Sequence, residues 1–318
     1  MPFIKKFTFV ICLFMAVMVS YTGASAQTIR LAIAHSDSLR ATLRTIKGIK
    51  SHIKSYQEDV EFHEFLLDTE SPRFQDKIDD IRKLDPRLIL TVGTAATKIM
   101  TDNIKDKPIV FSAVLNPETS GFVASLEFPG GNITGSSLDI PPDIQFKYFK
   151  NVIKGLKKIG VLYSNETANL IAPARRLAAS MGLELYAARI SSEKDIPVAL
   201  DSLNPIVDGF WSVADGRIYS PRSTRFILLN TLRHAKPFMG FSPNLVESGA
   251  LFGLSYDYKD IGRQAGKIAV QVLSGRPPAT IPVAVPGIIW FHYNENTARH
   301  INIEIPDDLA AVAKEVYQ

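Results

Sequence analysis

The stretch Leu84–Gly121, LDPRLILTVGTAATKIMTDNIKDKPIVFSAVLNPETSG, decides the fold class of this chain. It contains a short apolar run, Leu88–Val92, of the kind that forms a strand buried on both faces. A helical pattern opens at Thr94–Thr97, and a second apolar run follows at Ile109–Ser112. Strand, helix and strand in this order predict a βαβ unit. In open α/β sheets ligands bind at the carboxyl ends of the strands, here residues 93–95 and 112–116.

Length and composition fit a soluble globular protein with room for two domains. The chain has 318 residues, of which 46% are hydrophobic and 21% charged. The segment 1–26 has the pattern of a cleaved signal peptide: Lys5-Lys6, an apolar run over Phe7–Val19, and Ala24-Ser25-Ala26 as the cleavage site. The apolar run is short for a membrane span, so this pattern favours secretion to the periplasm over a retained anchor.

Removal of the leader changes what the composition implies. Cys12 is the only cysteine and lies inside the leader, so the mature chain needs no disulfides. Without Lys5 and Lys6 the basic residues number 34 (36 − 2), against 32 acidic residues. This balance gives no reason to expect a nucleic-acid partner.

The mature chain alternates strand-like and helix-like segments and repeats itself once. Predicted strands begin at Ile29 and at Lys158, an offset of 129 in the numbering (158 − 29). The dipeptides Lys107-Pro108 and Lys236-Pro237 are separated by the same offset (236 − 107 = 129). Order, spacing and dipeptide together favour two copies of one α/β domain over a chance likeness.

The remaining segment forms a return path after the two copies. Ala250–Ser255 is a predicted strand, and Asp257 is expected to cap a helix that runs to Leu273. Ile281–Val285 and 288–292 have a β-like pattern, and a short amphipathic helix is predicted over Asp307–Val316. Such a tail can cross between two lobes and form a multi-stranded hinge.

Signals for catalysis and for metal binding are poor. The sequence has no G-x-S-x-G elbow, P-loop or G-x-G-x-x-G motif. Its histidines show no metal-ligand spacing, and the mature chain has no cysteine. We therefore expect a protein that is not an enzyme and has neither a metal nor a cofactor.

The predicted strand ends carry hydroxyl, amide and small residues, which hold a polar ligand by hydrogen bonds without reacting with it. The candidate ligand-binding residues are His35, Ser36, Thr94, Ala95, Ser112, Asn116, Ser164, Asn165, Asn169, Asp215, Phe241 and Tyr256. Thr94 with the amides of 94–97 is suited to a carboxylate, and Asp215 to an ammonium group. Each has a structural alternative: a plain helix cap for Thr94, a turn-forming Asp-Gly for Asp215, and core packing for Phe241 and Tyr256.

Several motifs resemble one family over essentially the whole mature chain. The matching pieces are Val92–Thr97, Lys107–Phe111, Asn116-Pro117 with Gly121, Pro129–Gly135 (PGGNITG), Lys158–Tyr163, Tyr256-Asp257-Tyr258 with Gly262, and Gly275–Pro278. They resemble the ABC-transporter substrate-binding proteins whose best-understood members bind tryptophan or related aromatic amino acids. The resemblance implies a type I periplasmic binding protein fold, with two Rossmann-like lobes of parallel sheets, a hinge, and a ligand in the cleft. It implies a first lobe of 27–138 with 255–288 and a second of 139–254 with 289–318.

The resemblance also assigns roles by position. Thr94 matches the family's carboxylate-binding threonine, Asp215 matches an acidic residue suited to the α-amino group, and Ser164 and Asn169 lie on the loop that reaches the ligand from the second lobe. The family often has Asp-Pro where this chain has Asn116-Pro117, which removes a charge from the cleft.

The sequence therefore predicts a monomeric solute receptor of an ABC importer, which presents a small polar organic ligand, for example an amino acid, to a permease in the inner membrane. The alternative with the same fold is a periplasmic sensor subunit that reports its ligand to a membrane signalling protein. A secreted hydrolase is a third hypothesis, against which the missing nucleophile–base pair argues.

Overall fold

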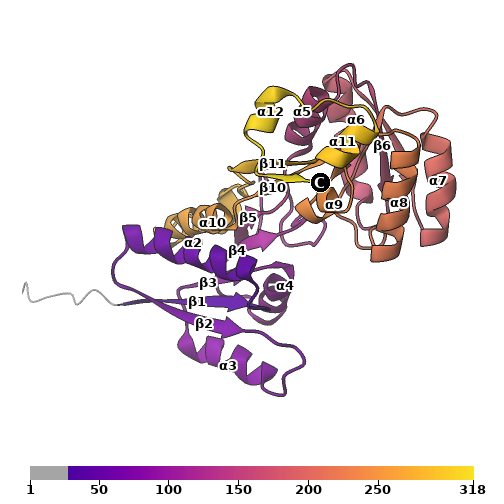
Figure 1. The fold of residues 1–318 in the computed structure, drawn as a ribbon. Helices are drawn as coiled ribbons and strands as arrows, with labels where there is room; N and C mark the ends of the chain where they lie inside the picture. Colours follow the sequence, from indigo (N-terminus) through magenta and orange to yellow (C-terminus); the bar gives the residue numbers. More distant parts are fainter. Residues whose placement is uncertain (1–27) are drawn as a thin grey trace, which may run out of the picture.

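The computed structural model describes residues 28–318, so the predicted signal peptide and Cys12 lie outside the described residues. Figure 1 shows two lobes, each built on one sheet with helices on both faces. The strands of the first sheet are β1 (Ile29–His35), β2 (Val60–Leu66), β3 (Leu88–Val92), β4 (Ile109–Val114) and β5 (Ile133–Ser137). All are parallel, in the order β2-β1-β3-β4-β5. The predicted strand over 88–92 is confirmed, and every residue of it is buried.

The second sheet repeats this order and extends it. Its strands are β6 (Lys158–Tyr163), β7 (Glu184–Arg189), β8 (Gly209–Trp211), β9 (Phe238–Gly240), β10 (Phe252–Tyr256), β11 (Ile289–Asn294) and β12 (Glu315–Tyr317). The order β7-β6-β8-β9-β10 matches that of the first sheet, which confirms two copies of one unit. β11 joins antiparallel to β10, and β12 lies parallel to β11 at the edge.

Helices cover both faces of the first sheet. They are α2 (Arg40–Tyr56), α3 (Phe74–Leu84), α4 (Thr94–Asn103) and α10 (Tyr258–Leu273). α2 and α10 lie side by side over one face, while α3 and α4 pack on the other (Figure 1). The predicted helix from Tyr258 to Leu273 is thereby confirmed, and the Asp257 side chain accepts a hydrogen bond from the N–H of Lys259 at its start.

α2 and α10 approach closely because glycines face each other. A Cβ on Gly262 would lie 2.0 Å from the carbonyl oxygen of Thr45, and one on Gly48 would lie 2.1 Å from that of Lys259. The absence of side chains at both positions lets the two backbones touch. This contact fixes the returning helix α10 to the first lobe.

The second lobe has the same layered arrangement. Its helices are α5 (Pro142–Val152), α6 (Ala168–Ser180), the 3-10 turn η2 (Glu193–Asp195), α7 (Ile196–Leu203), α8 (Pro221–Arg233), α9 (Pro243–Glu247), α11 (Glu295–His300) and α12 (Asp307–Ala311). α5 and α6 cover one face over a core rich in aromatic rings, including Phe149 and Phe252. α7 and α8 cover the other face, over Phe210 and Phe238.

The chain crosses between the lobes three times. It leaves β5 for α5 through Leu138–Pro141, and it returns from β10 to α10 through Asp257. The third crossing follows the 3-10 turn η3 (Pro278–Thr280) and ends at β11. The domain boundaries predicted from the sequence, 27–138 with 255–288 and 139–254 with 289–318, stay a prediction.

Two predicted elements of the tail were wrong. The closing helix ends at Ala311, and the segment after it forms β12, because the backbone of 315–317 pairs with β11. Ile281–Val285 is not a strand: only Ala284 makes a bridge, to Ser136 of β5. Ile281 and Val283 are buried nonetheless, so the apolar alternation there reflects packing and not sheet formation.

Candidate functional site

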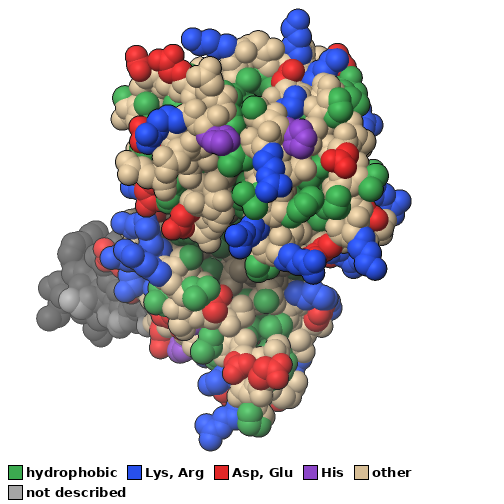
Figure 2. Space-filling view, turned by 45° about the vertical axis from the view of Figure 1, so that its right-hand side comes forward, with side chains coloured by type: hydrophobic (Ala, Val, Ile, Leu, Met, Phe, Trp, Pro, Cys, Tyr) green, Lys and Arg blue, Asp and Glu red, His purple; other side chains and the backbone are tan. Residues whose placement is uncertain are grey.

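The carboxyl ends of both sheets lie next to the hinge. β5 leads from its carboxyl end directly into the short crossing Leu138–Pro141, and β10 leads into the crossing at Asp257. In a parallel sheet the neighbouring strands end at the same edge, so both carboxyl edges border the space between the lobes. The space-filling view is hollowed between the upper and the lower lobe, and Lys and Arg side chains gather at that level (Figure 2). This space is the candidate ligand-binding cleft.

In the first lobe, the register of the strands aligns two of the predicted residues, His35 and Ser112, through Val92 of the strand between them. His35 pairs with Val92, Val92 with Ser112, and Ser112 with Ser136. His35 is buried, and its Nδ1 lies 2.7 Å from the carbonyl oxygen of Asp37, while the neighbouring Ser36 is half-buried. These strand ends therefore form one row.

The N-terminus of α4 is the most open part of this row. Gly93, with φ 90°, turns the chain from β3 into the helix and offers no side-chain cap. Thr94 and Ala95 are exposed at the first turn, where backbone N–H groups have no partner inside the helix. Thr97 anchors the turn by donating its hydroxyl to the carbonyl oxygen of Gly93 at 2.8 Å. Such an end attracts an anion such as a carboxylate.

Ser112 and Asn116 have different surroundings from Thr94. Ser112 is fully buried, and its Oγ lies 3.0 Å from that of Ser136, which donates to the carbonyl oxygen of Ile261 in α10. Ser112 thus connects β4, β5 and α10 inside the lobe. Asn116 is half-buried at φ 49°, and its backbone N–H points to the carboxylate of Asp139 at 2.8 Å.

In the second lobe, Asp215 organises its own loops. Its Oδ2 accepts from the N–H of Ser164 at 3.1 Å and from the hydroxyl of Thr167 at 2.6 Å, and its Oδ1 accepts from the N–H of Arg217 at 3.0 Å. Asp215 is buried, with 3% of its surface exposed. The Asp215 carboxylate therefore connects the loop after β6 with the loop after β8.

The other polar residues of the second lobe lie around that junction. Ser164 is buried, and its Oγ accepts from the N–H of Glu166 at 3.1 Å. Asn165 and Asn169 are exposed, and Asn165 accepts a hydrogen bond from Arg189. The two asparagines are thus free of the core and accessible to a solute.

The two predicted aromatic residues are half-buried in edge-to-face pairs. The ring of Phe241 lies 5.2 Å from that of Tyr219, and Tyr256 lies 5.3 Å from Tyr258. Burial raises the pKa of the Tyr256 hydroxyl, and so do Tyr258 and the charge of Asp139. Tyr256 is therefore a neutral hydrogen-bonding group close to Asp139, at the end of β10.

Sequence reasoning missed Asp139. It follows the polar end of β5, as part of Leu138–Pro141, and it is half-buried. Burial raises the pKa of its carboxyl group to about 6, and the charge of Glu118 adds to this, while hydrogen bonds from Ser137 and from the N–H of Asn116 act in the opposite direction. The sequence feature that could have identified Asp139 is an acidic residue shortly after a buried strand, at the edge of the sheet where strands lead into helices.

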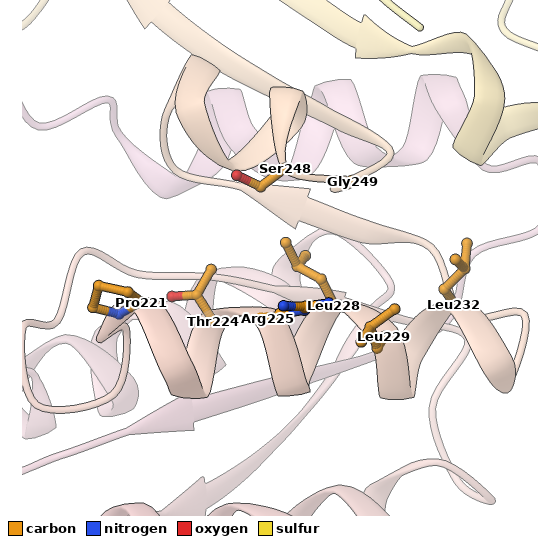
Figure 3. Close-up of a pocket in the computed structure, with 8 residues that line it drawn as sticks. All are labelled: Pro221, Thr224, Arg225, Leu228, Leu229, Leu232, Ser248 and Gly249. Carbon is orange, nitrogen blue, oxygen red and sulfur yellow. The ribbon is translucent and has the colours of Figure 1, made fainter.

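Two hollows of about 440 Å³ each lie elsewhere on the molecule. One lies between α8 and the turn at Ser248-Gly249, where Leu228 and Leu229 face it (Figure 3). The other follows α10 and is basic, with Arg263 and Lys267 on its wall. Neither is lined by a residue predicted for the ligand site.

Other classes of site find no support among residues 28–318. This part of the chain has no group of three or more His, Cys, Asp or Glu side chains able to hold a metal ion. Over the same residues, no helix has both the length and the apolar character that a membrane span requires.

A family model and two curated relatives match this chain. The family model described as "ABC transporter substrate binding protein" matches residues 32–317. A tyrosine-binding protein of Clostridioides difficile is 29% identical over 220 residues, which are 68% of this chain and 63% of the relative. An uncharacterised protein of Rickettsia prowazekii is 23% identical over 211 residues, 64% of this chain and 63% of the relative. The chain thus matches just under two thirds of the length of these curated relatives.

Solved structures agree on the fold. An ABC domain from Streptococcus pneumonia in complex with L-Trp covers 91% of this chain and all of its own, with 24% identity and a TM-score of 0.61. The ligand-free, open structure of a substrate-binding protein with adhesive properties from Clostridium difficile covers 91% of this chain and 99% of its own, with 22% identity and a TM-score of 0.73.

Proposed function

Because this chain belongs to the ABC transporter substrate-binding proteins, a family of solute receptors and not of enzymes, we propose that it binds an amino acid between its lobes. The fold is that of the type I periplasmic binding proteins, with two α/β lobes of parallel sheets. We propose further that it delivers this ligand to an ABC permease from the periplasm, as a monomer.

One observation carries the proposal: the open N-terminus of α4 at the carboxyl edge of the first sheet. Its exposed Thr94 and Ala95 offer a hydroxyl and unpartnered N–H groups to an anion, and a free carboxylate is the anion that all amino acids share. Across the cleft, Asn165 and Asn169 are exposed amides, and Phe241 and Tyr256 provide aromatic surface. The ligands named for two similar proteins, tyrosine and L-Trp, support an aromatic amino acid.

The test is a thermal-shift screen of the mature protein against the amino acids, purines and small organic acids, followed by calorimetry. A ligand that binds only the native state raises the melting temperature by mass action. We expect the largest shifts with tyrosine or tryptophan. A protein that responds to purines or small organic acids alone is still a solute receptor, but it contradicts the amino-acid proposal.

A matched control separates cleft binding from binding elsewhere. The hollow beside α8 is lined by Thr224, among others, and lies outside the cleft. Thr94→Ala should weaken binding, whereas Thr224→Ala should leave affinity unchanged. Equal effects of the two variants would place the ligand somewhere other than the α4 terminus.

A further inference from the structure

We propose that Asp139, at the hinge end of the cleft, receives the cationic amine of the ligand, with Tyr256 beside it. The inference rests on the proposed function and names the residue that sets its ligand class. It concerns a residue in the first crossing segment, which links β5 to α5. Tyr256 ends β10, immediately before the second crossing. The pair therefore belongs to both lobes and to the hinge.

The hydrogen bonds of Asp139 are one-sided. Its Oδ2 accepts from the N–H of Asn116 at 2.8 Å and from the hydroxyl of Ser137 at 2.8 Å. Among residues 28–318, no donor reaches its Oδ1 and no Lys, Arg or His forms an ion pair with it. Two neutral donors thus hold the carboxylate in place, and they leave one oxygen available.

A half-buried carboxylate without a cation is unfavourable, and this one has a negative neighbour as well. Burial disfavours its charged form, and Glu118 adds to the effect. The buried Asp260 is the contrasting case, because Arg263 reaches its Oδ1 at 2.6 Å and Gln264 its Oδ2 at 2.9 Å. A ligand cation at the open oxygen of Asp139 would supply what Arg263 supplies to Asp260.

The surroundings favour an ammonium group over a metal ion. The Oδ1 of Asp139 would give a metal ion only one carboxylate ligand. Residues 28–318 hold no group of three or more His, Cys, Asp or Glu side chains that could bind such an ion. The Tyr256 ring, in an edge-to-face pair with Tyr258, gives the adjacent surface that an organic cation prefers. Carboxylate and aromatic ring together fit a primary amine on a carbon chain.

Asp215, the other acidic residue near the cleft, is a weaker candidate for this role. Both of its oxygens already accept hydrogen bonds within the second lobe, from Ser164, Thr167 and Arg217. Asp139 is therefore the carboxylate that a ligand amine completes.

The experiment compares ligands that differ by one charged group, using calorimetry on the mature protein. L-tryptophan carries both groups, tryptamine lacks the carboxylate, and indole-3-propionate lacks the amine; tyrosine, tyramine and 3-(4-hydroxyphenyl)propionate form the second series. Asp139→Asn should weaken binding of the amine-bearing compounds at least tenfold. It should change the affinity for the propionates less than twofold. Asp143→Asn is the matched control, because Asp143 lies four positions further on and pairs with Lys147 at the surface.

Each outcome decides the inference. A wild-type protein that binds the propionates as tightly as the amino acids, or an Asp139→Asn variant that keeps the wild-type preference for the amino acids over the propionates, overturns it and leaves the solute-receptor function standing. Failure of every compound in both series and in the wider screen removes the proposed function together with the inference. Loss of amine binding in Asp143→Asn as well would refute the assignment to Asp139.

A second measurement needs no variant. Because the pKa of Asp139 is about 6, an ammonium group bound beside it should release about half a proton at pH 6. Calorimetry in two buffers of different ionisation enthalpy measures this release. The propionates should release none, and equal proton release for both classes of ligand contradicts the inference.

Discussion

Replacing Asp139 by Asn should stabilise the empty protein at neutral pH while it damages ligand binding. The pKa of this carboxyl group rises from 3.8 to about 6 on folding, mainly through burial. Between these two values the native state holds the proton more tightly than the unfolded chain does. Stability of the wild type therefore falls as the pH rises through this window, and above pH 6 the full cost of the ionised form is present.

The size of the effect follows from the same two values. About 1.4 kcal/mol for each tenfold change in proton affinity gives about 3 kcal/mol for a pKa that rises from 3.8 to about 6. Since Asp139 is only half-buried, water reduces this figure, and we expect about 1–2 kcal/mol. Asn keeps an oxygen for the donors Asn116 and Ser137 and has no charge to bury.

The assay is urea unfolding of the ligand-free mature protein, followed by circular dichroism at pH 4, 5, 6 and 7. The difference in unfolding free energy between Asp139→Asn and the wild type should grow with pH and level off near pH 7. Asp143→Asn should show no such trend, because Asp143 already has Lys147 as its partner. A difference that stays constant over the whole pH range would show that charge burial at Asp139 is not its cause.

Three further predictions concern packing and the proposed site. Gly262→Ala should destabilise the protein by about 1–3 kcal/mol in urea unfolding, because its Cβ would lie 2.0 Å from the Thr45 carbonyl oxygen; Gly216→Ala, with open space around it, should stay within about 0.5 kcal/mol. Thr94→Ala should weaken amino-acid binding in calorimetry by about fivefold to tenfold, and a loss of several degrees in the melting temperature of the empty protein would instead identify a structural cap. Asp215→Ala should lower the free energy of unfolding by about 2–4 kcal/mol, since it leaves buried donors unpaired, and an unchanged unfolding midpoint would contradict this role.

The sequence predicted the arrangement of the strands because burial leaves a direct mark on composition. β3 is buried at every residue. Its run from Leu88 to Val92 therefore lacks the alternation of apolar and polar residues that marks a strand with one exposed face. The repeat offset between Ile29 and Lys158 corresponds to the starts of β1 and β6, which hold the same place in their sheets. Repetition of the whole strand order follows from that spacing.

The tail was harder to predict because an apolar pattern indicates burial but not the identity of the backbone partner. Ile281 and Val283 alternate and are buried, yet Pro282 has no N–H to donate, and the backbone of the segment pairs with β5 only around Ala284. At the C-terminus, Val316 fits the apolar face of a helix equally well. Its neighbour β11 decides the outcome, since it offers an unpaired edge to 315–317.

The candidate site shows the same distinction between position and partners. Asp215 and Asp139 are both acidic residues near the carboxyl ends of strands, and position alone favours neither. Three donors of the second lobe already surround the Asp215 carboxylate, so its removal is expected to affect mainly stability. The Asp139 carboxylate has two donors on one oxygen and none within 28–318 on the other, so its removal should affect mainly ligand recognition. If Asp215→Ala lowers mainly the stability and Asp139→Asn lowers mainly the affinity for amines, then Asp215 holds the loops of the cleft in place and Asp139 recognises the ligand.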